Sequence, residues 1–391
     1  MTAAPTTSRR LASYVAIGGV CGLTWAAALR GWMVQLVGAQ ESRFSWLTLV
    51  LVLLPGLLIG LLLGRAAYLR GAGVAMSRWL VFSPALFAVA LLDPQIFAAL
   101  LRNGEGSGAL MVVATALTAG FALSRPGRSP TRLAAALVAV LGLLLLGSIG
   151  TMAAPWNTPR GAWVSLLGLS LMLLLCLAAV LPYPTVRAPR GAWSFVALGA
   201  LCGFTWSAAL RAFMVQVAGA ESAVHWVNTF GYFLLPGTVA GGLLGLAEHY
   251  RRTGGRRHWR WLTLSPFLFA AILIPGLIED PSTMFTGGVG AGTIAIPILA
   301  IIGGHALCGH GPLWSRSLAS LLGTAALLTW PITGTAVGGP TFAITTPHGL
   351  WATLLYDGLL VLLALAVSIP QSKPAPAQPA QKEARALVGA N

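Results

Sequence analysis

The residues best suited to chemistry in this sequence form a triplet that occurs twice. Each copy holds an arginine, a glutamine and a glutamate in the same order: Arg30, Gln35 and Glu41, then Arg211, Gln216 and Glu221. Within a copy, the arginine and the glutamate could form an ion pair that locks the chain, because either charge alone is costly at low dielectric constant. Alternatively, Arg30 and Arg211 bind an anionic group in an outer vestibule.

Asp357 is the only acidic residue predicted to lie deep within an apolar segment. A lone carboxylate is costly at that depth, so it is expected to be protonated, paired or turned toward water. It either couples solute movement to protons or is a packing carboxyl whose hydrogen bonds are satisfied.

Prolines and glycines interrupt the apolar segments at matching places in the two halves. The residues concerned are Pro55, Gly56, Pro84, Pro236, Gly237 and Pro266. A proline removes one backbone hydrogen bond and can kink its helix. Broken helices at corresponding places of two halves point to a transporter binding site. Kinks of this kind also serve as packing devices, and both interpretations stay open.

The pattern H-x-x-C-x-H at His305, Cys308 and His310 is a weak metal candidate. Imidazole and thiolate bind zinc or copper, but the spacing matches no standard site and no fourth ligand is evident. No cofactor is predicted. The sequence has no G-x-x-x-x-G-K-[ST] phosphate loop, no H-E-x-x-H and no G-x-S-x-G motif, so an enzyme is the less favoured class.

The composition indicates the class of protein that must position these residues. Charged residues make up 8% of the 391 residues and hydrophobic residues 57%, whereas a soluble domain is roughly 25% charged. The sequence therefore predicts an all-α polytopic membrane protein whose surface faces a lipid bilayer. The net charge of +15 is interpreted as a topology signal, and no nucleic-acid partner is predicted.

Twelve apolar segments could each cross the hydrocarbon core, which takes roughly 20 residues per helix. They lie near 12–29, 46–64, 79–92, 108–124, 133–153, 162–182, 193–210, 227–247, 261–278, 286–304, 317–333 and 350–369. The third is short. Residues 31–45 and 333–349 are too apolar for ordinary loops. The former is predicted to extend a helix or lie at the interface, and both are candidates for re-entrant segments.

The basic residues predict the orientation. With a cytoplasmic N-terminus, nineteen of the 24 Lys and Arg residues fall inside, and Arg30, Arg43, Arg102, Arg160 and Arg211 fall outside. Such positive-inside bias predicts a plasma-membrane protein with both termini cytoplasmic. The densest cluster is expected to touch anionic lipid headgroups: Arg251, Arg252, Arg256, Arg257 and Arg260.

The sequence is also duplicated. Residues 13–38, SYVAIGGVCGLTWAAALRGWMVQLVG, align with 194–219, SFVALGALCGFTWSAALRAFMVQVAG, and matches continue to Pro182 and Pro370. An even number of spans per half predicts two parallel six-helix repeats, related by a pseudo-two-fold axis along the membrane normal. Because the first segment is copied in mid-chain, it is interpreted as a retained span and not as a cleaved signal peptide.

These observations predict the domain organisation. A cytoplasmic N-terminus (1–11) precedes the first repeat (12–182), a cytoplasmic linker (183–192), the second repeat (193–370) and a disordered cytoplasmic tail (371–391).

The favoured function is a secondary transporter or permease for a small or lipid-like solute. The alternatives are an outer-leaflet enzyme acting on a lipid-linked substrate, in which the duplicated Arg and Glu residues bind phosphate or shuttle protons, and a non-catalytic membrane scaffold.

Overall fold

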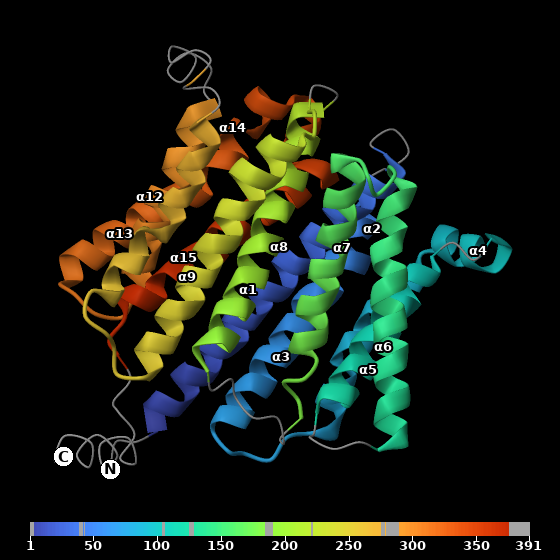
Figure 1. The fold of residues 1–391 in the computed structure, drawn as a ribbon, viewed down its shortest axis with the longest axis horizontal. Helices are drawn as coiled ribbons and strands as arrows, with labels where there is room; N and C mark the ends of the chain where they lie inside the picture. The colour runs from blue at the N-terminus through green and yellow to red at the C-terminus, as the bar shows by residue number, and fades with distance from the viewer. Residues whose placement is uncertain are drawn as a thin grey trace. The chain divides into compact units, whose positions relative to one another are not determined.

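The structure is helical throughout the residues that it describes. The computed structural model describes residues 4–38, 42, 44–103, 106–124, 129–183, 191–219, 222–274, 278 and 289–374 (Figure 1). Within these ranges every regular element is a helix and no β-strand occurs. The predicted all-α fold is therefore confirmed for the described part of the chain.

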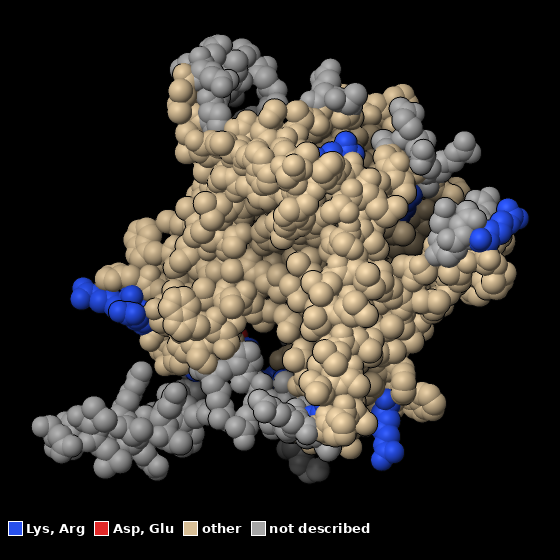
Figure 2. Space-filling model, turned by 45° about the vertical axis from the view of Figure 1, so that its right-hand side comes forward, with Lys and Arg blue, Asp and Glu red and all other residues tan. Residues whose placement is uncertain are grey.

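Eight helices among the described residues are long and apolar enough to cross a membrane. They are Arg10–Val37, Trp46–Gly71, Pro130–Met152, Pro159–Ala178, Ala192–Ala218, Trp226–Arg252, Leu313–Gly338 and Pro347–Gln371. Each coincides with one of the twelve predicted spans. On the face drawn in Figure 2, nearly all of the described surface belongs to residues other than Lys, Arg, Asp and Glu. Such helices indicate an integral membrane protein.

The other four predicted spans are also helical, but shorter or bent. Ser107–Leu123, Trp259–Leu273 and Gly292–Leu307 are shorter apolar helices. At the third predicted span, Arg78–Leu92 is followed by Ile96–Arg102 at an angle of 95°. Eight spans are thus supported by length and composition, and the number twelve stays a prediction.

The chain divides into two compact units. The first unit comprises Met1–Ala188, Ala208–His225 and Thr329–Leu359. Its complete elements are α1 (Ala4–Val37), α2 (Trp46–Thr48), η1 (Leu49–Leu53), α3 (Leu54–Gly71), η2 (Arg78–Leu92), α4 (Pro94–Asn103), α5 (Ser107–Leu123), α6 (Pro130–Ile149), η3 (Gly150–Met152), α7 (Pro159–Ala178), α14 (Thr329–Gly338) and η7 (Pro340–Phe342).

The second unit comprises Pro189–Ser207, Trp226–Leu328 and Leu360–Asn391. Its complete elements are η5 (Trp226–Leu234), α9 (Leu235–Arg252), η6 (Trp259–Leu273), α12 (Val289–Leu307) and α13 (Leu313–Leu327). Its core includes Leu244, Ala300, Leu363 and Val367. Two helices, α8 (Ala192–Ala218) and α15 (Pro347–Gln371), contribute residues to both units.

Glycines allow α1 and α3 to pack with their backbones in contact. A Cβ atom on Gly60 would collide with the carbonyl oxygen of Gly18, and one on Gly22 would collide with that of Gly56. Glycines four residues apart lie on one helix face, and such small residues let membrane helices approach closely. The α1–α3 pair is therefore stabilised by close van der Waals packing, and no side chain lies between the two backbones at these glycines.

The same packing recurs between α8 and α9 in the second unit. A Cβ atom on Gly241 would collide with the Gly199 carbonyl oxygen, and one on Gly203 would collide with that of Gly237. These four glycines align in sequence with the glycines of α1 and α3. The aligned segments thus make the same kind of helix contact in each unit.

The two apolar connections take different forms. Residues 31–37 continue α1 as a helix up to Val37, and Gly38 follows with a φ of 86°. Residues 333–338 complete α14, and the 3₁₀ turn η7 then leads to α15 at Pro347. The structure therefore confirms the predicted helical extension after Arg30 as far as Val37. Residues 39–41 and 43 lie outside the described part.

Candidate functional site

Threonine–proline caps fix the first turns of α7 and α15, which frame the candidate site. The Gly161 N–H donates to Oγ1 of Thr158 (3.1 Å), and the Gly349 N–H donates to Oγ1 of Thr346 (3.0 Å). A proline follows each threonine, where its fixed φ and missing N–H suit a helix start. The caps place Arg160 and His348, one residue after each proline, at equivalent positions of the two helices.

Arg30 lies in a buried aromatic setting near the end of α1. It is 8% exposed, and its Nη1 donates to Oγ of Ser42 at 2.9 Å. Its guanidinium carbon lies 4.3 Å from the centre of the Phe44 ring, which stacks on His348 at 4.2 Å. A desolvated guanidinium over an aromatic face gains a cation–π attraction of about 2 kcal/mol.

Arg211, the counterpart of Arg30 on α8, has similar polar contacts. It is also 8% exposed, and its Nη1 donates to Oγ of Ser222 at 2.9 Å. Its Nη2 donates to the Ala223 carbonyl oxygen at 2.6 Å. Both arginines therefore tie the end of a long helix to the chain segment that follows it.

Two buried tryptophans link the halves of the sequence reciprocally within the first unit. The Trp351 indole of α15 donates to the Ala27 carbonyl oxygen of α1 at 2.9 Å. The Trp163 indole of α7 points to the Ala208 carbonyl oxygen of α8 at 3.4 Å. Trp163 aligns with Trp351, and Ala27 aligns with Ala208. Each half thus inserts the same tryptophan against the same helix of the other half.

A pocket of about 220 Å³ lies beside Arg211 at this end of the first unit. Its lining comprises Gln35, Arg160, Val215, Ser222, Ala223 and Val224. The predicted site residues Arg30, Gln35 and Arg211 are therefore all found in this region, together with the aligned pair Arg160 and His348. Gln216 is half-buried on α8 and does not line the pocket, and Glu41 and Glu221 lie outside the described residues.

No protein-family model, curated protein or solved structure matches this chain.

Asp357 lies on α15, as the sequence predicts, and is half-buried. Its Oδ1 atom is buried and has no hydrogen-bond partner among the described residues. The neighbouring Tyr356 ring packs against Phe213 and Trp330. Gly358 lies against the Thr24 side chain of α1, where a Cβ atom would collide with the hydroxyl. A carboxylate oxygen left without a partner is unusual in a packed interior and calls for an explanation.

The predicted breaks at Pro55 and Pro236 follow π-helical segments. The π-helix η1 (Leu49–Leu53) leads into Leu54-Pro55-Gly56, and η5 (Trp226–Leu234) leads into Leu235-Pro236-Gly237. A proline ring clashes with the carbonyl group four residues earlier in an α-helix. That carbonyl lies in the π-helical turn, whose wider ring of backbone atoms gives it room.

The predicted breaks at Pro84 and Pro266 lie inside 3₁₀ helices. η2 (Arg78–Leu92) and η6 (Trp259–Leu273) each have 15 residues, although 3₁₀ runs longer than three or four residues are uncommon. Ser83 and Ser265 precede the prolines, and both have a buried Oγ atom without a hydrogen-bond partner among the described residues. Departures from α-helical geometry therefore occur at aligned places in both halves.

The metal candidate is not supported by the side-chain arrangement. The Cys308 thiol donates to the carbonyl oxygens of His305 and His310, and His305 Nε2 lies 3.1 Å from Ser315 Oγ. No group of three or more His, Cys, Asp or Glu residues within the described ranges could hold a metal ion. These contacts stabilise the turn between α12 and α13.

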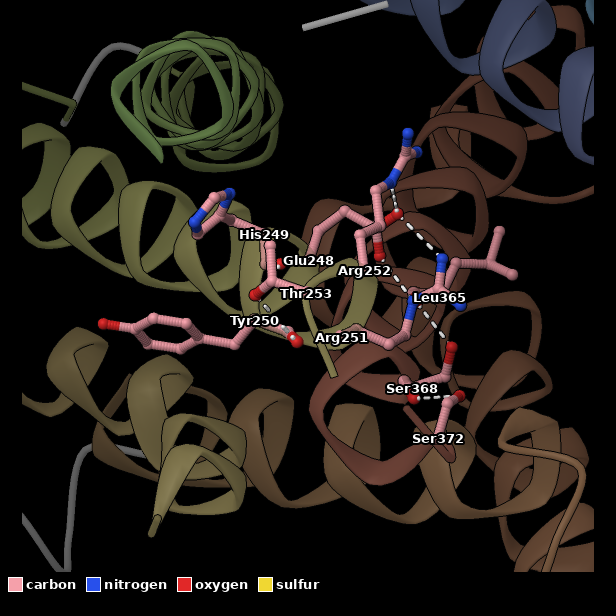
Figure 3. A network of polar contacts seen from close by, with 9 residues as sticks. All are labelled: Glu248, His249, Tyr250, Arg251, Arg252, Thr253, Leu365, Ser368 and Ser372. Carbon is pink, nitrogen blue, oxygen red and sulfur yellow. Dashed lines mark hydrogen bonds and ion pairs between the residues drawn. The ribbon is translucent and has the colours of Figure 1, made fainter. Parts of the chain in front are cut away.

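An acidic residue, Glu248, neutralises part of the predicted lipid-contact cluster. Glu248 forms ion pairs of 2.6 Å with both Arg251 and Arg252 at the end of α9 (Figure 3). Arg256 donates to the Tyr250 hydroxyl at 3.2 Å. Arg257 and Arg260 are exposed. The basic charge available to an anionic surface is thus concentrated in the residues after α9.

Replacing Arg30 by lysine is expected to lower stability by about 1–3 kcal/mol. An ammonium group cannot stack as a plane on Phe44 while it donates to Ser42. Thermal unfolding of the purified chain in detergent would measure the effect. The control is Arg102→Lys, because Arg102 is exposed. Equal melting temperatures for the two variants would contradict the role assigned to Arg30.

Proposed function

We propose that this chain is a secondary permease for a small or lipid-like solute. The single observation that carries the proposal is the matched pair of non-α segments. In each half, a π-helix precedes Leu-Pro-Gly and a 15-residue 3₁₀ helix contains Ser-Pro. Helices broken at corresponding places in two repeats are the arrangement in which transporters bind substrate and coupling ions.

The 3₁₀ helices favour a number of spans larger than eight. At a rise of about 2.0 Å per residue, 15 residues in 3₁₀ form extend about 30 Å, which equals the thickness of the hydrocarbon core. The same residues as an α-helix would extend only about 22 Å. The 3₁₀ helices in the predicted spans 79–92 and 261–278 can therefore be long enough to cross a bilayer, which would bring the eight spans to ten.

The reciprocal tryptophan contacts favour two parallel six-helix repeats. Trp351 reaches Ala27, and Trp163 reaches Ala208, as a pseudo-two-fold axis along the membrane normal would require. In this proposal residues 12–182 and 193–370 are the repeats, 183–192 is a cytoplasmic linker, and 1–11 and 371–391 are cytoplasmic. The protein resides in the plasma membrane, where the arginines after α9 meet anionic lipid.

Asp357 is the proposed proton-coupling residue. Its buried Oδ1 has no described partner, so a proton could bind there without first breaking a described hydrogen bond at that atom. In proteoliposomes containing a pH-sensitive dye, we expect succinate, inorganic phosphate or a short-chain phosphatidic acid to cause proton movement. Asp357→Asn is expected to slow that movement by about tenfold or more, because an amide cannot carry the proton.

The control for this experiment is Asp93→Asn, which changes a carboxylate between η2 and α4. Thermal unfolding would confirm that both variants are folded. Wild-type proton movement in Asp357→Asn would exclude Asp357 from coupling. Failure of the folded wild-type protein to move any of the three probes would contradict the permease proposal itself.

A further inference from the structure

The pocket beside Arg211 concentrates positive charge. Arg160 lines it from the first turn of α7, and that turn contains no acidic residue. The N-terminus of an α-helix is positive and normally favours Asp or Glu nearby. An arginine at this place raises the positive potential further, and Arg211 adds a second guanidinium behind Ser222. The pocket is therefore suited to an anion.

The pocket lining includes three residues whose side chains can donate hydrogen bonds: Gln35, Arg160 and Ser222. Gln35 is 2% exposed and lines the pocket. Ser222 accepts a hydrogen bond from Arg211, and no described residue accepts the proton of its hydroxyl. A ligand with acceptor oxygens is therefore matched by the amide of Gln35 and the hydroxyl of Ser222.

The pocket is large enough for a phosphate group together with several water molecules. Its volume of about 220 Å³ corresponds to about seven water molecules at roughly 30 Å³ each. The donors come from three separate segments: Gln35 on α1, Arg160 on α7 and Ser222 after α8. A tetrahedral oxyanion accepts from several directions at once, and arginine is the residue best matched to it.

We propose that this pocket binds a phosphate group, either free or carried as the headgroup of a lipid. Arg160 and Arg211 supply the charge, and the Gln35 amide and the Ser222 hydroxyl donate to the phosphate oxygens. This site would lie on the predicted outer side of the membrane, and it does not require that the protein transports the phosphate.

The aligned place in the other half of the sequence is filled by an aromatic side chain. Ser222 and Val224 align with Ser42 and Phe44, and Arg160 aligns with His348. The Phe44 ring lies between the Arg30 guanidinium and the His348 ring, 4.3 Å from the former and 4.2 Å from the latter. Val224 has no ring to fill the corresponding space. The duplicated arginines therefore differ in their surroundings: Arg30 packs on Phe44, whereas Arg211 lies 5.9 Å from the centre of the Trp163 ring and supports an open pocket.

The variant Val224→Phe tests this difference directly. It introduces, beside Arg211, the aromatic ring that Phe44 places beside Arg30 in the first half. Binding of radiolabelled inorganic phosphate to the purified full chain in detergent would be measured at equilibrium. We expect Val224→Phe to weaken binding by about tenfold or more, since it occupies the pocket. Arg160→Ala is expected to weaken binding to a similar extent, because it removes a charged donor. Arg102→Ala, which removes an exposed arginine that does not line the pocket, is the control and should leave the phosphate affinity unchanged.

Val224 is only half-buried and Arg160 is exposed, so both variants should fold, as thermal unfolding would verify.

Displacement of bound phosphate by mixed micelles containing phosphatidic acid, but not by phosphatidylcholine alone, would identify a lipid headgroup as the ligand. Phosphate bound equally in the presence of either lipid would identify the free ion. No phosphate binding by the wild type, or wild-type affinity in both Val224→Phe and Arg160→Ala, would overturn the proposal. Since no gradient is involved, phosphate binding can succeed while transport fails, and the two proposals are tested separately.

Discussion

Leucine in place of Gly60 is expected to destabilise the protein by about 3 kcal/mol or more, at the upper end of overpacking effects. A Cβ atom on Gly60 would collide with the Gly18 carbonyl oxygen and press on the Gly22 Cα atom. Both obstacles are backbone atoms of α1, so no side-chain rotation can relieve the clash. The α1–α3 pair must separate, and the loss of packing extends along both helices.

Thermal unfolding in detergent would compare Gly60→Leu with its counterpart Gly241→Leu and with a control. We expect Gly241→Leu to be equally damaging, because its Cβ atom would meet the Gly199 carbonyl oxygen. Gly147 lies in the apolar helix α6, with no described atom within 4 Å of an added Cβ. Gly147→Leu should therefore be tolerated. A melting temperature for Gly60→Leu equal to that of Gly147→Leu would show that α1 and α3 are not in backbone contact.

The sequence predicted where the helices lie because apolar length is a direct physical requirement of a membrane span. It did not predict their geometry at Pro84 and Pro266. The residues around these prolines are apolar and compatible with an α-helix, and nothing in their pattern distinguishes 15 residues of 3₁₀ helix from an α-helix. The matching positions of the prolines are the available signal, and they predict a kinked or broken helix without specifying 3₁₀ geometry.

The glycine contacts could have been predicted. Gly18 and Gly22, like Gly56, Gly60 and Gly64, are spaced four residues apart within apolar segments. That spacing is the known signature of close packing between membrane helices. It identifies the residues that pack but not their partner, because any second helix with small residues could fit. The pairing of α1 with α3 therefore required the structure.

The candidate site was only partly predictable. Duplication marked Arg30, Gln35 and Arg211 as residues with a shared role, but duplication cannot show where two copies differ. The difference lies at Phe44 and Val224, whose importance becomes visible only when the ring is seen between Arg30 and His348. The predicted Arg–Glu ion pair stays a prediction, since Glu41 and Glu221 lie outside the described residues.

The reciprocal tryptophans give the second large expected effect. Trp351 and Trp163 are both 0% exposed, and truncating a buried tryptophan to alanine costs about 3–5 kcal/mol. We expect Trp351→Ala and Trp163→Ala each to lower the stability by that amount. Trp193, which is 83% exposed, provides the control, and Trp193→Ala should change the stability by no more than about 0.5 kcal/mol.

A phenylalanine substitution separates the volume of the indole from its hydrogen bond. Trp351→Phe retains most of the apolar contact but removes the donor to Ala27, and within a membrane such a bond contributes only about 0.6 kcal/mol on average. We therefore expect Trp351→Phe to retain most of the stability that Trp351→Ala loses, as measured by unfolding in mixed micelles. If the contacts are related by pseudo-two-fold symmetry, Trp163→Phe must follow the same order. A chain that tolerates Trp163→Ala but not Trp351→Ala would show that the two halves do not hold each other in the same way.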